Sequence, residues 1–137
     1  MKTLFVAYRV TDLDRSLGFY TALGYVELGR VEPGAGARLA ILKFPGEPAA
    51  SLELVDRPGD GRIDVGNGFD HLAIQVETLA TALETLAESG LEPEPIQYPG
   101  GPHGPKTSWL TDPDGYRIEL VEWPSGHPDG ITAADFS

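Results

Sequence analysis

The chain contains two copies of one sequence pattern. Residues 4–56 align with residues 70–122 without a gap, at an offset of 66 positions. In this alignment Glu53-Leu54-Val55 matches Glu119-Leu120-Val121. A repeat of this period indicates that each copy is one supersecondary unit. We therefore expect two equivalent modules, in which matching residues occupy equivalent places.

Each copy begins with a strand pattern that leads into a helix. Apolar and polar residues alternate over Leu4–Val10 and over Leu72–Val76, as they do in a half-buried strand. Suitable helix N-caps and C-terminal glycines follow, and the apolar stripes between them have helical spacing. The N-caps are Thr11-Asp12 and Thr78, the glycines are Gly24 and Gly90, and the stripes are Leu13, Leu17, Tyr20 and Leu79, Leu83, Leu86.

Three strand-like stretches follow each predicted helix. They cover residues 25–31, 38–44 and 50–56 in the first copy, and 92–98, 106–111 and 116–122 in the second. Asp112-Pro113-Asp114-Gly115 is a turn signal between the last two. The fold class is therefore α+β, with two tandem βαβββ modules in one domain spanning residues 1–137. The modules are residues 3–56 and 69–123, the linker is 57–68, and an irregular tail covers 124–137.

Composition excludes several kinds of site. With 10 basic and 21 acidic residues the formal charge is −11, which disfavours binding to nucleic acid or to anionic membranes. No cysteine is present, so a metal site must use His, Asp or Glu. The first residues lack the pattern of a secretory leader and no apolar run is long enough to span a bilayer. We expect a soluble, cytoplasmic protein that acts on a small molecule.

Strand alternation places a set of polar residues on one sheet face. Leu4, Val6, Tyr8 and Val10 should lie under the helix, and so should Leu72, Ile74 and Val76. The opposite face then carries Phe5, Arg9, Glu53, His71, Gln75 and Glu119. If the two sheets curl toward each other, these side chains line a cleft.

The residues of this face also have simpler interpretations. A single Glu in a strand is usually solvent-facing, and a single His is usually half-exposed. The combination favours a shared metal or acid–base site, because Glu53 and Glu119 have the same phase in the repeat and His71 is close to them by symmetry. His103 and His127 lie in a loop and in the tail, where we expect solvent exposure; alternatively, either one could complete a metal site.

The sequence resembles the vicinal-oxygen-chelate superfamily, which includes glyoxalase I, bleomycin-resistance proteins and extradiol dioxygenases. Residues 9–20 resemble the opening strand and helix of that group, and residues 112–120 resemble its closing hairpin. The likeness covers residues 1 to 123 and is nearest to glyoxalase I. It implies two βαβββ modules that form curved mixed sheets around a cleft.

The resemblance also implies a metal site. The superfamily takes its ligands from the first and last strands of each module, which here correspond to Phe5, Glu53, His71 and Glu119. Three of these match glyoxalase I, and Phe5 replaces its first histidine. The implied cofactor is a divalent ion, nickel, cobalt or zinc, held by Glu53, His71 and Glu119. Glu119 would be the catalytic base with Glu53 as its partner, and Arg9 and Phe5 would contact the substrate.

Two functions follow from the resemblance. The first is a glyoxalase I-like lyase or isomerase that converts the hemithioacetal of a thiol and a 2-oxoaldehyde into a 2-hydroxyacyl thioester. The alternative is a non-catalytic protein that binds an antibiotic, as bleomycin-resistance proteins do, to which Phe5, Trp109 and the acidic charge are suited. Glyoxalase I relatives form their cleft across a twofold dimer, so a homodimer is implied as well.

Overall fold

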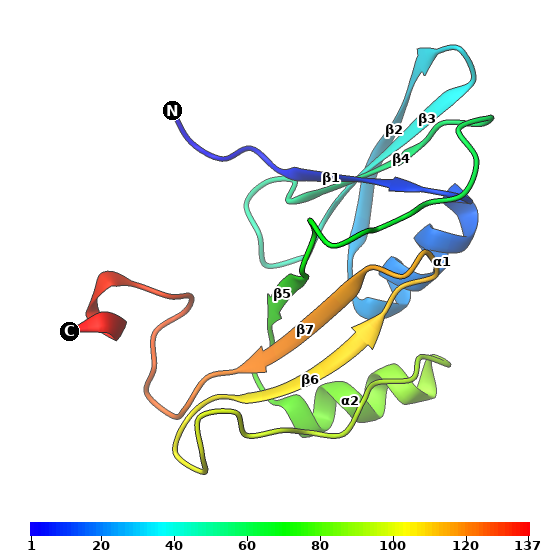
Figure 1. The fold of residues 1–137 in the computed structure, drawn as a ribbon. Coiled ribbons are helices and arrows are strands. Elements are labelled where there is room, and N and C mark those ends of the chain that lie inside the picture. The colour runs from blue at the N-terminus through cyan, green and yellow to red at the C-terminus, as the bar shows by residue number, and fades with distance from the viewer. The chain divides into compact units, whose positions relative to one another are not determined.

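The computed structural model describes residues 1–137 and divides into two compact units. The first contains residues 1–68 and 112–115, and the second contains residues 69–111 and 116–137. Each unit joins a short mixed sheet to one helix (Figure 1). Neither helix has the length and apolar character needed to cross a membrane.

The first unit has the predicted strand–helix–three-strand order. Its sheet has the strand order β1-β4-β3-β2, in which β1 and β4 are parallel and the other pairs are antiparallel. This sheet is mixed because the chain crosses over through the helix before it returns beside β1. The elements are β1 (Val6–Val10), α1 (Leu13–Leu23), β2 (Val26–Gly34), β3 (Ala37–Lys43) and β4 (Leu52–Asp56).

The second unit repeats this order with one strand fewer. Its sheet has the order β5-β7-β6, with β5 and β7 parallel and β6 and β7 antiparallel. The C-terminal tail, residues 124–137, includes a short 3₁₀ helix, η1. The elements are β5 (Leu72–Gln75), α2 (Leu79–Glu88), β6 (Lys106–Thr111), β7 (Arg117–Glu122) and η1 (Ala133–Phe136).

The predicted strand at residues 92–98 is wrong. Only an isolated bridge between Gln97 and Thr107 forms there, although this segment runs beside β6 and the Glu94 N–H donates to the Trp109 carbonyl at 2.9 Å. Pro93 and Pro95 explain the difference, because proline has no N–H with which to continue a ladder. The segment keeps backbone hydrogen bonds to β6 without forming a regular strand.

Both helices begin and end near the predicted caps. Asp12 is the N-cap of α1, and its carboxylate accepts a hydrogen bond from the Arg15 N–H at 3.1 Å. Gly24 ends α1 with a φ of 124°, a value that favours glycine because it has no Cβ. The apolar stripe of α1 is buried as expected. In α2, Leu79 and Leu86 are buried and Leu83 is half-buried.

The first strand is shorter than predicted. Its pairing with β4 begins at Val6 opposite Leu52, so Leu4 lies outside the sheet. Tyr8 and Val10 are buried beneath the helix, whereas Val6 is 43% exposed and Leu4 is 73% exposed. The expectation that all four lie in the core is therefore wrong for Leu4 and Val6, because the buried part of β1 is only its end nearest the helix.

A carboxylate at the end of the last strand caps the helix in both units. Asp56 accepts a hydrogen bond from the Leu13 N–H at 3.4 Å, and Glu122 accepts one from the Leu79 N–H at 2.8 Å. Each carboxylate also pairs with a basic residue of the neighbouring strand, Arg38 at 3.1 Å and Lys106 at 3.2 Å. The repeat thus duplicates a helix cap that satisfies a free N–H and places negative charge at the helix N-terminus.

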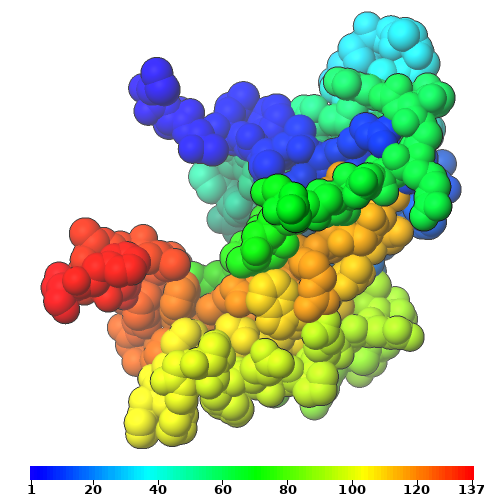
Figure 2. Space-filling view, in the orientation of Figure 1, coloured from blue at the N-terminus to red at the C-terminus, as the bar shows by residue number.

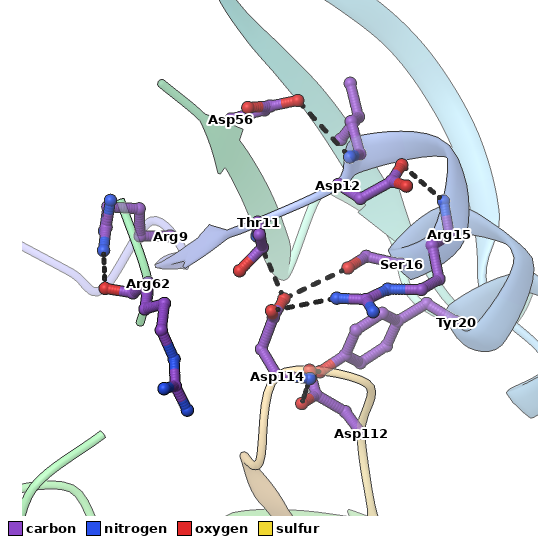
Figure 3. A network of polar contacts seen from close by, with 11 residues as sticks. Arg9, Thr11, Asp12, Arg15, Ser16, Tyr20, Asp56, Arg62, Asp112 and Asp114 are labelled. Atoms are coloured by element: carbon purple, nitrogen blue, oxygen red, sulfur yellow. Dashed lines mark hydrogen bonds and ion pairs between the residues drawn. The ribbon is translucent and has the colours of Figure 1, made fainter. Parts of the chain in front are cut away.

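The predicted turn at Asp112–Gly115 belongs to the first unit and packs on α1 (Figure 3). Asp114 accepts hydrogen bonds from the Thr11 N–H at 3.2 Å, from Arg15 at 3.2 Å and from the Ser16 hydroxyl at 3.5 Å. The hydroxyl of Tyr20, a fully buried residue, donates to Asp112 at 2.7 Å. Burial, together with the Asp112 carboxylate, raises the pKa of Tyr20, which remains a neutral donor.

Candidate active site

His71 and Glu119 lie side by side in the second unit. His71 immediately precedes β5, and Glu119 lies in the middle of β7, where it pairs with Ala73 of β5. The parallel pairing brings the His71 Nε2 atom to 3.7 Å from a Glu119 carboxylate oxygen. Ala73 is small enough to leave the carboxylate open, and the two side chains are 30% and 22% exposed.

Asp70 orients the His71 ring. One of its carboxylate oxygens is 2.5 Å from His71 Nδ1, so this nitrogen faces Asp70 and Nε2 faces Glu119. The separation of 3.7 Å from Glu119 is too long for a hydrogen bond, but it suits two ligands that each lie about 2.1 Å from one ion. A carboxylate behind a histidine is also the usual second partner of a metal-binding imidazole. This donor pair therefore fits a divalent metal ion.

Trp109 forms a wall beside this pair. It lies opposite Glu119 in the β6–β7 register, and its ring meets the His71 ring edge to face with centroids 5.0 Å apart. The Arg117 guanidinium lies 5.1 Å from the centre of the Trp109 ring and forms an ion pair with Glu94. Trp109 is half-buried and packs against His71 and Arg117, so its position is fixed by its neighbours.

A largely apolar pocket of about 370 Å³ opens over Glu119 on the face of this sheet. Glu119 is the only ionisable residue among those that line it. The remaining lining residues are Ala73, Ile74, Gln75, Pro99, Pro105, Thr107, Val121, Trp123, Gly130 and Ile131. A carboxylate in such surroundings can act on a bound molecule from which bulk water is partly excluded.

Glu53 has the equivalent place in the first unit. It lies in β4 between Ala7 of β1 and Ile41 of β3, as Glu119 lies between Ala73 and Trp109. Phe5 immediately precedes β1, as His71 precedes β5, and it is half-buried. Glu53 and Phe5 belong to the first unit and His71 and Glu119 to the second, so a site that all of them share stays a prediction. Within either unit, no three His, Asp or Glu side chains are grouped to hold a metal ion.

Residues 3–120 match the family described as the Glyoxalase/Bleomycin resistance protein/Dioxygenase superfamily. The chain belongs to this superfamily. A probable lactoylglutathione lyase from Synechocystis sp. is 34% identical over 130 residues, which cover 89% of this chain and 95% of that protein. A lactoylglutathione lyase from Salmonella typhimurium is 34% identical over 128 residues, which cover 89% of this chain and 93% of that protein.

Solved structures of the superfamily share the fold. Trypanothione-dependent glyoxalase I from Leishmania major superposes with a TM-score of 0.71 at 30% identity, covering 89% of this chain and 86% of that one. The resemblance inferred from the sequence is therefore confirmed, and so is the α+β class with two helices and two mixed sheets.

Arg9, the residue that the superfamily resemblance assigns to the substrate, is engaged by the linker. Its guanidinium donates to the Arg62 carbonyl at 3.0 Å and lies 3.8 Å from the Asp60 carboxylate. The side chain is 30% exposed, and Figure 3 shows it turned toward residue 62. Arg9 thus lies on the predicted strand and remains accessible, with contacts that a bound anion would have to share or replace.

Gln75 has a role that the sequence does not reveal. Its side-chain oxygen accepts hydrogen bonds from the Trp123 indole at 2.6 Å and from the Gly130 N–H at 2.8 Å, and its amide nitrogen donates to Asp129 at 2.8 Å. Three contacts to the chain after β7 make Gln75 the anchor of this segment. Neither spacing nor composition relates Gln75 to partners about fifty positions away in a proline- and glycine-rich tail.

The prediction that His127 is solvent-exposed is wrong, because this residue is half-buried. Its ring stacks on Trp123 with centroids 4.6 Å apart, and its nitrogens lie 2.6 Å from the Pro128 carbonyl and 2.6 Å from the Asp135 carboxylate. Both ring nitrogens are therefore occupied within the tail, which contradicts a free histidine ready to bind metal. His103 is exposed, as expected.

Proposed function

We propose that this chain is a glyoxalase I-like enzyme that converts the hemithioacetal of a thiol and a 2-oxoaldehyde into a 2-hydroxyacyl thioester. The observation that carries this proposal is the His71–Glu119 pair, with Asp70 behind the imidazole and an apolar pocket over the carboxylate. Two relatives that match nearly all of the chain carry the name lactoylglutathione lyase. The antibiotic-binding alternative has no observation of comparable weight.

A divalent ion would be held by His71 Nε2 and a Glu119 oxygen, with Glu53 as the proposed third protein ligand. When bound, such an ion acts as a Lewis acid on oxygen atoms of the substrate. Nickel, cobalt and zinc all accept imidazole and carboxylate ligands, so the identity of the ion is left to experiment. Asp70 contacts Nδ1, so Nε2 is the ring nitrogen that remains to bind an ion.

The reaction needs a proton to move between neighbouring carbons of the substrate. Glu119 is suited to remove the proton from the carbon that bears sulfur and oxygen, and to return it to the adjacent carbon. The carbon-bound proton moves to the adjacent carbon, and the hydroxyl proton moves from the oxygen of the first carbon to the oxygen of the second. Atoms and charge then balance, because the first carbon is oxidised as the second is reduced and the thiol stays attached. Glu53 would serve as the partner carboxylate, Arg9 would bind an anionic end of the thiol, and Phe5 would pack against the substrate.

The test uses protein purified without chelator and supplied in turn with nickel, cobalt or zinc. Methylglyoxal and glutathione form the substrate adduct, and thioester formation is followed by absorbance. We expect metal-dependent turnover that falls at least about a hundredfold in Glu119→Gln and Glu53→Gln, with Glu88→Gln as a control on the exposed side of α2. Absence of turnover with every metal and with several thiols would overturn the proposal.

Asp70 provides a sharper test of the metal site. Asp70→Asn removes the negative charge behind His71, so metal affinity should fall by about 10- to 100-fold. Competition with a chelating dye measures this affinity directly and requires no substrate. An unchanged affinity would contradict the role of Asp70 as the partner that supports His71.

We also propose a homodimer, by analogy with the superfamily, and a cytoplasmic location, as the sequence predicts. A metal-free protein that binds a drug but turns over no adduct would instead favour the antibiotic-binding alternative.

A further inference from the structure

We propose that Gln75 is a positioning residue that fastens the C-terminal tail as a wall of the Glu119 pocket, so that the tail selects the substrate's carbon side chain. The inference rests on the proposed function for the nature of the substrate. The fastening of the tail rests on contacts within the second unit alone.

Gln75 lies at a point of β5 from which it can reach both the pocket and the tail. Gln75 is the last residue of β5, and its neighbour Ala73 is the residue that pairs with Glu119. The Gln75 side chain makes three hydrogen bonds at once, and each partner lies after β7. A neutral amide suits this place, because it offers an acceptor to two N–H groups and a donor to a carboxylate.

The Gln75 anchor positions part of the wall of the pocket. Trp123, Gly130 and Ile131 line the pocket over Glu119, and two of them are bonded directly to Gln75. In Figures 1 and 2 the tail leaves the end of β7 and continues beyond the end of its own sheet. Without the anchor, the pocket would lose this side and open to solvent.

The wall of the pocket over Glu119 is largely apolar. The pocket that Trp123 and Ile131 line is lined also by Pro99, Pro105 and Val121, so the space beside Glu119 is largely apolar. The part of a substrate that fits there is its hydrocarbon group, whereas its oxygens would turn toward Glu119 and His71. For a 2-oxoaldehyde that group is the substituent on the ketone carbon, which is methyl in methylglyoxal and phenyl in phenylglyoxal.

A charge exchange tests the anchor. Gln75→Glu keeps the acceptor but places a carboxylate against Asp129, so the tail should detach. Asp129→Asn keeps an acceptor for the Gln75 amide and serves as the matched control. The double variant, Gln75→Glu with Asp129→Asn, restores a donor–acceptor pair with reversed roles and should behave as the wild type does.

Two measurements compare the wild type, the two single variants and the double variant. Hydrogen–deuterium exchange of residues 124–137, without substrate, should be about tenfold faster in Gln75→Glu only. The ratio of kcat/KM for the glutathione adducts of phenylglyoxal and methylglyoxal should shift by about tenfold in the same variant and return in the double variant. Simple destabilisation would lower both rates together and would leave this ratio unchanged.

The outcomes separate this inference from the proposed function. Unchanged tail exchange in Gln75→Glu, or a failure of the double variant to restore it, overturns the anchor. Altered exchange with an unchanged substrate ratio overturns the role in selection. Altered and restored exchange in a protein that turns over neither adduct supports the anchor and contradicts the proposed function alone.

Discussion

Tyr20 supplies a buried hydrogen bond between α1 and the turn at Asp112–Gly115. The Tyr20 side chain is fully buried, and its hydroxyl meets a carboxylate 92 positions further along the chain. A buried carboxylate that loses a donor retains the cost of its desolvation. The Tyr20 hydroxyl therefore contributes more to the free energy of unfolding than a solvent-exposed hydroxyl would.

Tyr20→Phe should lower the free energy of unfolding by about 1–3 kcal/mol, because Asp112 loses the donor at 2.7 Å while its burial is unchanged. Urea denaturation measures the difference. Tyr98→Phe is the control, since Tyr98 is 51% exposed and should change stability by less than about 0.5 kcal/mol. Equal effects of the two substitutions would contradict this role of Tyr20.

At the residue level, the repeat predicts the sheet face on which a side chain lies better than it predicts the hydrogen-bond partners of that side chain. Glu53 and Glu119 could be placed because strand alternation and a constant offset fix the face and phase of each. Gln75 was placed on the correct face, but its bonds to Trp123, Asp129 and Gly130 depend on where an irregular tail returns to the sheet. No local pattern encodes that return, and the same is true of His127.

Among the elements, each helix depends on a carboxylate at the end of a distant strand. The Leu79 N–H donates to Glu122, and this hydrogen bond, with a further contribution from Lys106, lowers the pKa of the carboxyl. A lowered pKa in the folded state means that the ionised carboxyl stabilises the fold above its ordinary pKa of about 4.3. This stabilisation is lost as the pH falls through the lowered value.

Glu122→Gln should therefore lower the free energy of unfolding by about 1 kcal/mol at pH 7, because a charged helix cap is lost. The difference from the wild type should shrink below about pH 4, where the wild-type carboxyl is protonated as well. Urea denaturation across a pH series measures this. Glu84→Gln, on the exposed surface in the middle of α2, should show no such trend.

The C-terminal tail is also held together by contacts of His127. The Asp135 carboxylate, the Pro128 carbonyl and the charge of Asp135 raise the pKa of His127. Both ring nitrogens face acceptors, which requires the imidazolium form if both are to donate. Glu77 and Asp129, which line the same surface hollow, add further negative charge near the ring.

A raised pKa in the ordered tail gives the opposite pH dependence. The His127 contacts are complete below the ordinary pKa of about 6.5 and are lost as the pH rises through the raised value. Hydrogen exchange of residues 124–137, corrected for intrinsic rates, should therefore accelerate in that range. His127→Gln should exchange faster at acidic pH and lose the pH dependence, whereas His103→Gln should match the wild type. A tail whose protection is independent of pH would contradict the assignment.

Element prediction succeeded where caps and alternation agree and failed where backbone chemistry overrides the pattern. Asp12 and Gly24 bound α1 as expected, because an N-cap acceptor and a residue with positive φ are local requirements. Residues 92–98 were expected to form a strand, yet Pro93 and Pro95 remove the donors that a ladder requires. The two prolines therefore decide the backbone structure of this segment.

For the molecule as a whole, the proposed homodimer makes a prediction about mass. Several large apolar side chains of the first unit are exposed in the single chain, and a second copy would shield part of them. They include Leu4, Val6, Val26, Leu28 and Val31. Sedimentation velocity at micromolar concentration should give a species of twice 14.7 kDa. A single species of 14.7 kDa at all concentrations would contradict the dimer.

The two tryptophans give this protein a built-in optical readout. Trp109 touches the His71 ring, and Trp123 touches the amide of Gln75 and the ring of His127. Emission from Trp109 should respond to an ion or proton at His71, while emission from Trp123 should respond to release of the tail. Because the sequence contains no other tryptophan, replacing either one with phenylalanine leaves a signal from a single place. Metal loading and tail movement can then be timed separately in the two single-tryptophan variants, without an attached dye.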